Sequence, residues 1–322
     1  MKVNLSLNPT EEAQTLNLNQ IFDLAIIGSG AAGYSAAIYA RRYSLNTIVI
    51  GADHGGIITE TNLVENYPGF KEISGQELMN RFKEHARRYE AKFLDDSIES
   101  ISKEDRIYLL KSRGGKIIKA KSVILATGTK RRKLNALGEE KFRNKGVSYC
   151  AICDGAFYKD KVVGVVGGGD GAASSAVQLT QYASKVYMFV RSKLRAEPYW
   201  QNLLKKEDKI EILTGVEIAE IFGNDKVEGV KLNNGQIIGL NGLFIDIGSV
   251  PNSELAKQIG VETNEQGFIV VNKNMETNMP GVYAAGDVTD SLPRFKQVVV
   301  SAAQGAIAAN SAYHFFKEEK IK

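Results

Sequence analysis

Cysteine and histidine are scarce in this sequence. Its 322 residues include 2 cysteines and 3 histidines, which are His54, His85 and His314. A structural zinc ion needs four ligands held close together, mostly Cys and His. Because the histidines are scattered along the chain, we expect no metal site.

An excess of positive charge is also absent. The chain has 41 Lys and Arg against 37 Asp and Glu, so its net charge is only +4. Proteins that bind nucleic acid concentrate basic residues more strongly than this, and we expect no nucleic-acid partner. The one short basic cluster is the tract "KRRK" at 130–133. It is either a solvated loop after a strand or a targeting or phosphate-binding patch.

No apolar run is long enough for a membrane span. The longest stretch of small apolar residues, at 298–309, is too short and too polar to cross a bilayer. Residues 1–20 contain acid and no apolar run, so we expect no signal peptide. The sequence therefore predicts a cytoplasmic protein without membrane contact. In that reducing compartment a close cysteine pair is typically catalytic or metal-binding rather than structural.

Glycine, by contrast, is abundant, at 31 residues, which suits an α/β protein with many tight turns. The first cluster is "GSGAAG" at 28–33, between an apolar strand at 22–27 and a helix rich in small residues. In this strand–turn–helix setting the pattern predicts dinucleotide binding. Gly28 makes the tight turn, Gly30 lets the backbone approach a pyrophosphate, and Gly33 lets the helix pack on the strand.

The same unit occurs a second time. A strand at 162–166 leads into "GGGDGA" at 167–172, a helix, and a further strand at 185–190. Ala172 replaces the third glycine, which the fingerprint permits. A glycine-rich turn in an ordinary βαβ unit is the alternative. We call each of these glycine turns, which would hold a dinucleotide's phosphates, a cradle. Two cradles in a chain long enough for two domains predict two dinucleotides, and the natural pair is a flavin and a nicotinamide.

Two further apolar strands end in glycine motifs, "ATG" at 126–128 and "AAGD" at 284–287. Because Asp287 directly follows a strand, we expect its carboxylate at the C-terminal edge of a sheet, where α/β proteins bind ligands. The alternative is that it caps a following helix. The helix expected over roughly 297–315 carries Gln297 and small residues, which allow a ring system to approach closely.

Both cysteines lie in one short motif, "CAICD", as Cys150 and Cys153, with Asp154 directly after them. A CxxC motif at the start of a helix holds two thiols close enough to form a disulfide, and a helix N-terminus lowers the pKa of a thiol. The motif therefore predicts a redox-active pair. A metal site and a buried structural pair are the alternatives.

Together, GSGAAG, ATG, CxxCD, a second GGGDxxA and a late AAGD resemble the low-molecular-weight thioredoxin reductases. The resemblance covers nearly the whole chain, from about 20 to 315. It is specific, because many flavoproteins have the glycine motifs but few place CxxCD between them.

The resemblance implies an α/β fold with two Rossmann-like dinucleotide-binding domains, the second inserted in the first. Residues 1–127 and 252–322 are implied to hold FAD, and 128–251 to form the NAD(P)H-binding insert with the CxxC motif. The "ENYPG" turn at 65–69 matches a turn near the flavin in this family. The family usually has Gln-Leu where this chain has isoleucines at 57–58, so one polar contact to FAD is expected to be missing.

The resemblance also implies the residues that hold two cofactors, FAD and either NADPH or NADH. Those expected to hold FAD are Gly28, Gly30, Ala31, Gly33, Gly55, Gly56, Asn66, Ala126, Thr127, Gly128, Gly286, Asp287, Gln297 and Val298. Those expected to hold the nicotinamide dinucleotide are Gly167, Gly169, Asp170, Ala172, Arg191 and Arg195.

The redox roles follow from the same resemblance. Cys153 is implied to be the thiol next to the flavin, Cys150 the thiol that attacks the partner's disulfide, and Asp154 the general acid/base. Electrons are implied to pass from a nicotinamide through FAD and this pair to thioredoxin or a similar small redox protein, by a mixed disulfide. The family rotates one domain against the other, with hinges expected near 128 and 251. A homodimer is expected from the family alone.

The chain departs from the family where NADPH is recognised. Relatives that prefer NADPH carry HRRDxxR, whereas this chain reads "FVRSKLR" at 189–195, with Val190 in place of one arginine. Serines at 174–175 replace the usual Glu. Because Arg191 and Arg195 remain, we expect NADPH to be preferred and NADH to be used measurably. The alternatives are a same-fold thiol–disulfide oxidoreductase with another electron donor or a small-molecule dithiol substrate, and a non-catalytic, flavin-bound redox sensor.

Overall fold

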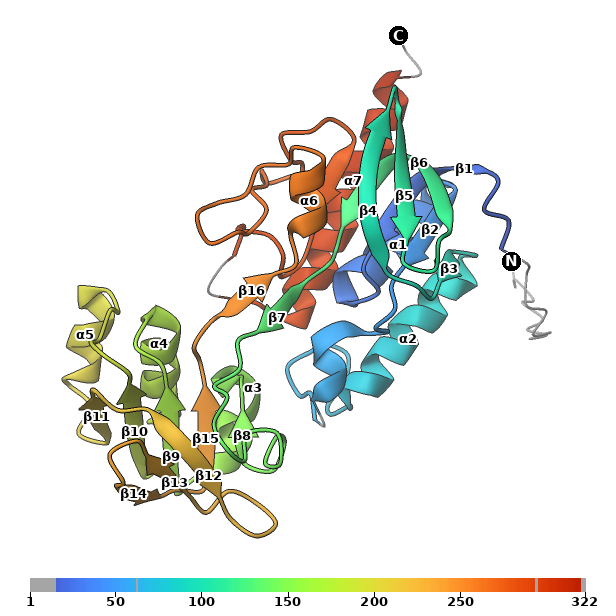
Figure 1. The fold of residues 1–322 in the computed structure, drawn as a ribbon. Coiled ribbons are helices and arrows are strands. Elements are labelled where there is room, and N and C mark those ends of the chain that lie inside the picture. Colours follow the sequence, from blue (N-terminus) through green and yellow to red (C-terminus); the bar gives the residue numbers. More distant parts are fainter. Residues whose placement is uncertain (1–15, 62, 293–294, 320–322) are drawn as a thin grey trace.

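The chain forms two α/β lobes joined by a narrow ribbon of two strands (Figure 1). The computed structural model describes residues 16–61, 63–292 and 295–319. Most of the N-terminal segment in which we expect no signal peptide therefore lies outside the described residues. Within the described part of the chain, no helix has the length and apolar character of a membrane span.

The first lobe is built on a seven-stranded sheet in the order β3-β2-β1-β6-β5-β4, with β17 also paired to β6. Its strands are β1 (Ile21–Ile27), β2 (Thr47–Ile50), β3 (Lys92–Leu94), β4 (Ile98–Glu104), β5 (Ile107–Ser112), β6 (Ile117–Leu125) and β17 (Val282–Ala284). Its helices are α1 (Ala31–Arg42), the 3₁₀ turn η1 (Gly56–Glu60), α2 (Gly75–Arg88), α6 (Glu254–Gln258) and α7 (Val298–Glu319).

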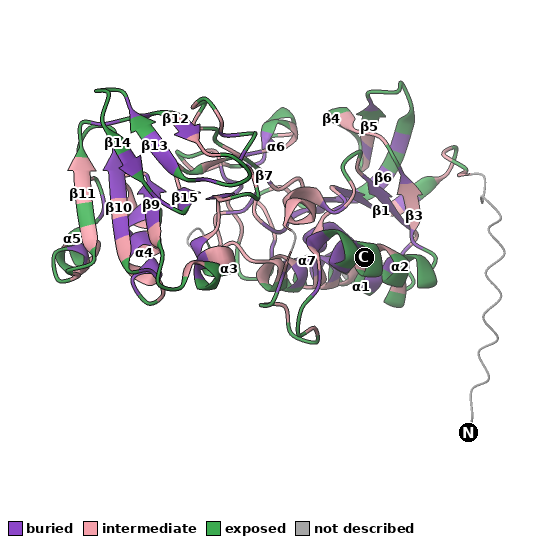
Figure 2. Ribbon diagram, turned by 90° about the horizontal axis from the view of Figure 1, so that it is seen from below, coloured by how far each residue is buried: buried purple, intermediate pink, exposed green. Residues whose placement is uncertain are grey.

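The strands at the centre of this sheet are parallel and buried on both faces. β1 pairs in parallel with β2 and β6, and β17 pairs in parallel with β6. The sequence of β1, IFDLAII, is almost continuously apolar, as expected for a parallel strand covered on both sides. Figure 2 shows the buried residues concentrated on the strands of both lobes.

The second lobe is built on a five-stranded parallel sheet in the order β11-β10-β9-β15-β8. A three-stranded antiparallel sheet, β12-β13-β14, lies beside it. The strands are β8 (Val147–Ser148), β9 (Val162–Val166), β10 (Lys185–Val190), β11 (Ile210–Thr214), β12 (Ile218–Phe222), β13 (Gly229–Leu232), β14 (Ile237–Gly239) and β15 (Gly242–Ile245). The helices are α3 (Ala151–Asp154), η2 (Gly155–Tyr158), α4 (Asp170–Leu179) and α5 (Pro198–Leu204).

Each lobe has its own hydrophobic core. In the first lobe, buried side chains from before and after the insert pack together, for example Phe22 and Val123 with Ile269 and Val282. The two large clusters of the second lobe draw only on residues between 134 and 247. The expected fold class is therefore confirmed: two Rossmann-like units, the second inserted in the first.

The chain passes between the lobes along two adjacent strands, β7 (Thr129–Arg131) and β16 (Ser249–Pro251), which pair antiparallel. Their ends at the first lobe are fastened by a reciprocal pair of hydrogen bonds. The Thr127 hydroxyl donates to the Asn252 carbonyl (2.7 Å), and the Asn252 amide donates to the Thr127 carbonyl (2.8 Å).

Small residues let α1 and α7 pack closely in the first lobe. A Cβ added at Gly305 of α7 would lie 2.0 Å from the carbonyl oxygen of Ala32 in α1. Since Gly305→Ala must push these helices apart, we expect it to lower the free energy of unfolding by about 2 kcal/mol. Urea unfolding measures the change, with Gly239→Ala as the control because its added Cβ meets one atom at 3.9 Å. Equal stability of both variants would contradict this packing.

Candidate functional site

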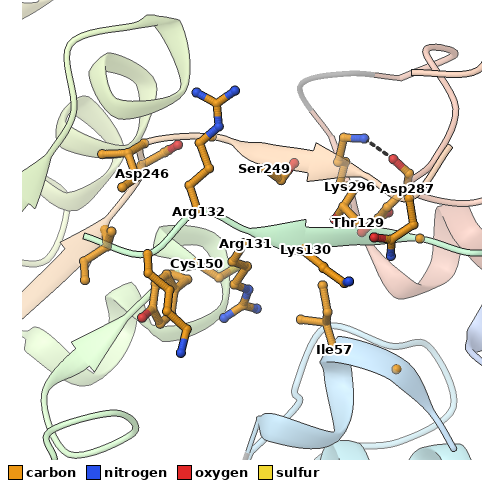
Figure 3. A pocket seen from close by; sticks show the side chains of 18 of the residues that line it. Ile57, Thr129, Lys130, Arg131, Arg132, Cys150, Asp246, Ser249, Asp287 and Lys296 are labelled. Carbon is orange, nitrogen blue, oxygen red and sulfur yellow. Dashed lines mark hydrogen bonds between the residues drawn. The ribbon is translucent and has the colours of Figure 1, made fainter. Parts of the chain in front are cut away.

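One cleft of about 2160 Å³ runs between the two lobes. It is lined by both glycine clusters, by Cys150 and Cys153, and by the basic tract at 130–133. Figure 3 shows side chains from the first lobe, the ribbon and the second lobe facing this space. In the described part of the chain, no group of three or more His, Cys, Asp or Glu side chains is placed to hold a metal ion.

The three glycines of the first cluster have distinct surroundings. Gly28 has φ 117°, and a Cβ there would lie 2.1 Å from the Ala126 carbonyl oxygen. A Cβ at Gly33 would lie 1.9 Å from the Gly28 carbonyl oxygen. A Cβ at Gly30 would meet, among the described residues, just the Gly55 carbonyl oxygen, at 3.7 Å. Gly28 and Gly33 therefore permit the turn and the helix packing, while Gly30 faces the open cleft, as a pyrophosphate cradle requires.

Most of the residues predicted to hold FAD gather on this side of the cleft. Those that line it are Gly28, Gly30, Ala31, Gly55, Gly56, Ala126, Thr127, Gly128, Gly286, Asp287, Gln297 and Val298. Gly33 lies beneath the turn, and the Asn66 side chain donates a hydrogen bond to Gln297 Oε1 (3.2 Å). The fold thus brings together residues from six separate stretches of sequence.

Asp287 follows β17 at the edge of the sheet. Among the residues that the structure describes, the next helix is α7, which starts at Val298, so the helix-capping alternative does not describe Asp287. Its Oδ1 accepts a hydrogen bond from Ser301 (3.3 Å), and Lys296 Nζ donates to its carbonyl oxygen (Figure 3). Burial raises the pKa of Asp287, and the charge of Lys296 offsets part of that rise.

The second glycine cluster has the same division of roles. Gly167 has φ 145°, and a Cβ there would lie 2.2 Å from the Asp246 carbonyl oxygen and 2.7 Å from the Ala172 Cβ. In the part of the chain that the structure describes, no atom beyond the adjoining backbone lies within 4 Å of a Cβ built at Gly169. Both cradles therefore leave one glycine open to the cleft, and both fit a dinucleotide. The carboxylate of Asp170 instead accepts a hydrogen bond from the backbone N–H of Glu197 (2.7 Å).

The two arginines predicted to read a 2′-phosphate lie exposed at the rim of the cleft. The backbone N–H of Arg195 donates to the Gly168 carbonyl (2.6 Å), which holds this loop against the cradle. Arg191 Nε lies 3.9 Å from Glu217 Oε1, and both side chains are well exposed. This long contact between exposed groups leaves the Arg191 guanidinium free to bind an anion.

Asp246 directly follows β15 and lines the cleft, although it was not predicted from the sequence. Its Oδ2 accepts a hydrogen bond from Ser175 of α4 (3.0 Å), and its carboxylate lies against Gly171 of the second cradle. Burial raises the pKa of Asp246, and the Ser175 hydrogen bond opposes that rise. The available signal was the one used for Asp287, an acid placed immediately after an apolar strand.

The redox pair lies where β8 meets the short helix α3. Cys150 is the N-cap residue and Cys153 lies within the helix; they form a disulfide with their Cα atoms 5.3 Å apart. The backbone N–H of Cys153 donates to Cys150 Sγ (3.2 Å). Ile152, between the two cysteines, has 44% of its surface exposed. A disulfide at a cleft with an exposed neighbour is accessible to thiol–disulfide exchange.

Asp154 is half-buried just behind the disulfide. The hydroxyl of Ser148 donates to Asp154 Oδ2 (2.6 Å). Burial raises the pKa of Asp154, and the Ser148 hydrogen bond and the charge of Arg131 oppose the rise. A carboxyl with a raised pKa exchanges protons more readily near neutral pH than an exposed one does.

A second feature missed from the sequence is a contact between the lobes beside this disulfide. Glu60 of η1 forms an ion pair with Arg143 of the second lobe. The Asn144 amide also donates to the Glu60 carbonyl (2.7 Å). No sequence pattern indicates this contact, because it depends on how the two lobes face each other.

Comparison with known proteins gives three findings. The sequence profile of the pyridine nucleotide-disulphide oxidoreductases matches residues 22–305. A thioredoxin reductase of Listeria innocua serovar 6a is 38% identical over 309 residues, which is 94% of this chain and 96% of the relative. A crystal structure of thioredoxin reductase from Streptococcus pyogenes MGAS5005 superposes with a TM-score of 0.86 at 36% identity, covering 93% of this chain and 99% of that chain.

A third relative superposes less well. The Lactococcus lactis thioredoxin reductase structure described as the FR conformation has a TM-score of 0.64 at 35% identity, with 92% of this chain and 99% of that chain covered.

The raised pKa of Asp154 has a consequence for stability. Burial favours the protonated form in the folded state, so the contribution of this group to stability is complete below its unfolded pKa and is lost as the pH rises through its folded pKa. Asp154→Asn cannot ionise, so we expect it to be more stable than the parent at pH 7 but not near pH 4.

Urea unfolding of both proteins at the two pH values measures this difference. The exposed substitution Asp160→Asn serves as the control. A stability gain of equal size at both pH values would show that ionisation of Asp154 is not its cause.

Proposed function

Since the chain belongs to the pyridine nucleotide-disulphide oxidoreductase family, we propose that it is a thioredoxin–disulfide reductase that takes electrons from NAD(P)H through FAD and the Cys150–Cys153 pair. The resemblance to thioredoxin reductases in the motifs is confirmed by relatives that match nearly the whole chain. The observation that carries the proposal is that the Cys150–Cys153 disulfide lines the same cleft as both dinucleotide cradles.

The first cradle is the proposed FAD site. The Gly28–Gly33 loop would hold the pyrophosphate, while Thr127, Asp287 and Gln297 line the rest of the space. FAD, when bound, supplies a ring that accepts two electrons from a nicotinamide and passes them to a disulfide. The second cradle, with Gly167–Ala172, is the proposed site for the nicotinamide dinucleotide.

The two cysteines have different proposed tasks. We assign Cys153 to the flavin side and Cys150 to the attack on the partner's disulfide, which proceeds through a mixed disulfide. Asp154 holds or releases a proton at its carboxyl group as Cys150 and Cys153 are reduced or oxidised. Its hydrogen bond from Ser148 fixes that carboxyl at the end of α3.

The domain boundaries are part of the proposal: 1–127 and 252–322 for FAD, and 128–251 for the insert. The positive φ values at Gly128 (63°) and Gly248 (87°), close to the two ends of the ribbon, support a hinge there. The comparisons also support movement between lobes. Two relatives of nearly equal identity, 36% and 35%, superpose with TM-scores of 0.86 and 0.64, as expected when rigid parts are placed differently.

Thioredoxin or a similar small redox protein is the proposed partner. A cytoplasmic location and a homodimer complete the proposal, and both come from the family resemblance. A reducing compartment also suits a chain whose 2 cysteines are both in one CxxC motif.

The cysteine roles are tested by two substitutions. Cys150→Ser and Cys153→Ser should both lose the reduction of a thioredoxin disulfide while the bound flavin is still reduced by NADPH. Cys153→Ser leaves Cys150 free to attack, so we expect a stable mixed disulfide with a thioredoxin that lacks its own resolving cysteine. Mass spectrometry detects this adduct, which Cys150→Ser should form poorly. Full turnover by either variant would disprove the dithiol relay.

The electron donor is tested at the second cradle. A 2′-phosphate is best held by guanidinium groups, so Arg191→Ala/Arg195→Ala should lower kcat/KM for NADPH by about tenfold or more per lost contact. The value for NADH should change little. Lys185→Ala, which removes a cation paired with Glu211, is the control.

Two results would count against this donor. If the double variant uses NADPH as well as the parent does, these arginines do not read the phosphate. If neither coenzyme reduces the flavin, the same-fold oxidoreductase with another electron donor is favoured. The observation that supports this alternative is Val190, which stands where relatives that prefer NADPH carry an arginine, so one contact to a 2′-phosphate is missing at the second cradle.

A further inference from the structure

Arg131, in the middle of the basic tract at 130–133, lies at the wall of the cleft beside the redox pair. It is half-buried, and its guanidinium lies over the ring of Tyr149, with 4.9 Å between Cζ and the ring centroid. Tyr149 directly precedes Cys150, and its hydroxyl donates to Glu139 Oε1 (2.7 Å). Figure 3 labels Arg131 and Cys150 among the residues that line the cleft.

The guanidinium of Arg131 has no ion pair and no side-chain hydrogen bond with any residue that the structure describes. The two acids whose charges act on Arg131 are already engaged. Glu60 is paired with Arg143, and Asp154 accepts from Ser148. Burial lowers the pKa of Arg131, and the charges of Glu60 and Asp154 only partly compensate. A cation that is partly removed from water is stabilised by a negative charge that forms near it in the cleft.

We propose that Arg131 stabilises the thiolate of Cys150 when the disulfide is reduced. The inference rests on the proposed function for the source of electrons, but it concerns only the chain's own residues. When the Cys150–Cys153 bond takes up two electrons and one proton, the S–S bond breaks and leaves one thiol and one thiolate. The new negative charge forms in the same cleft that Arg131 lines, one residue along the chain from the Tyr149 ring that its guanidinium covers, and the N–H groups of Arg131 are unused.

The local geometry favours Cys150 as the charged sulfur. Cys150 Sγ already accepts the backbone N–H of Cys153 (3.2 Å), and hydrogen bonds to a charged form stabilise it. Tyr149 fixes the guanidinium through its ring and is itself fixed by Glu139. A lower thiol pKa at Cys150 increases the fraction of nucleophile available for attack on a disulfide. Arg131 would thus be a specific activator of the attacking thiol.

Other charged and titratable groups surround the pair and contribute to the same field. They are Asp154 and Tyr158 from α3 and η2, Glu60 from η1, Arg143 and Glu139 from the segment before β8, Lys130 from β7, and Asp287 with Lys296 from the edge of the first lobe. The acids among them raise the pKa of a thiol, whereas Arg131 and the other cations lower it.

The test uses the Cys153→Ser protein as purified, in which Cys150 is the remaining cysteine. The rate of alkylation by iodoacetamide, followed by mass spectrometry across pH, gives the pKa of Cys150 directly. Arg131→Met should raise this pKa by about one unit or more. At pH values below the pKa of Cys150 in both proteins, the alkylation rate should then fall about tenfold. Arg131→Lys should restore most of the effect because it keeps the charge.

Lys133→Ala is the matched control, because it removes a positive charge from the same tract at an exposed position paired with Glu140. Arg131→Gln replaces Arg131→Met if the latter does not fold. An unchanged pKa of Cys150 in the Met or Gln variant would overturn the proposal, as would an equal shift in Lys133→Ala. The readout needs no nicotinamide, so it stands apart from a failure of the proposed electron donor.

Discussion

The pairing of β7 with β16 is the constraint on which the rest of this structure depends. Because the chain enters and leaves the second lobe along adjacent antiparallel strands, the two parallel sheets keep separate cores and still share one cleft. Each sheet presents glycine turns at the C-terminal ends of its strands, where α/β proteins bind ligands. A single connection would leave the lobes free to separate, whereas a broad interface would fix them. The ribbon gives two dinucleotide cradles one common space.

Electrostatics in this space follow from burial. Asp154, Asp246 and Asp287 each follow or flank a strand end, and burial raises the pKa of all three. Each has a hydroxyl donor, from Ser148, Ser175 and Ser301 respectively. Lys296 and Arg131 bring positive charge to the same cleft, and burial lowers the pKa of both. The cleft therefore holds carboxyl groups and a lysine whose pKa values are shifted toward neutrality, which suits the coupled movement of protons and electrons, while Arg131 stays charged.

Sequence patterns predicted the local elements well, because they depend on neighbours along the chain. The strands expected at 162–166 and 185–190 are β9 and β10, and the steric roles of Gly28 and Gly33 match their surroundings. Features that depend on tertiary contact were missed. The ion pair between Glu60 and Arg143 and the position of Arg131 at the redox pair require knowledge of how the lobes face each other. The tract at 130–133 was interpreted as a solvated loop or a targeting or phosphate-binding patch, yet its first two residues belong to β7.

The reciprocal hydrogen bonds between Thr127 and Asn252 also bear on how such a chain can be assembled. These hydrogen bonds hold together the two chain segments at which the insert leaves and rejoins the first lobe. The first lobe is therefore nearly continuous across the insertion point. Closing a loop between ends that already touch costs little entropy, and that cost grows only slowly with the length of the loop. The first lobe can therefore accept inserts of very different length at this one position. The joint between the lobes is therefore an insertion point, at which a whole domain can be gained, lost or exchanged without a change in the sheet of the first lobe.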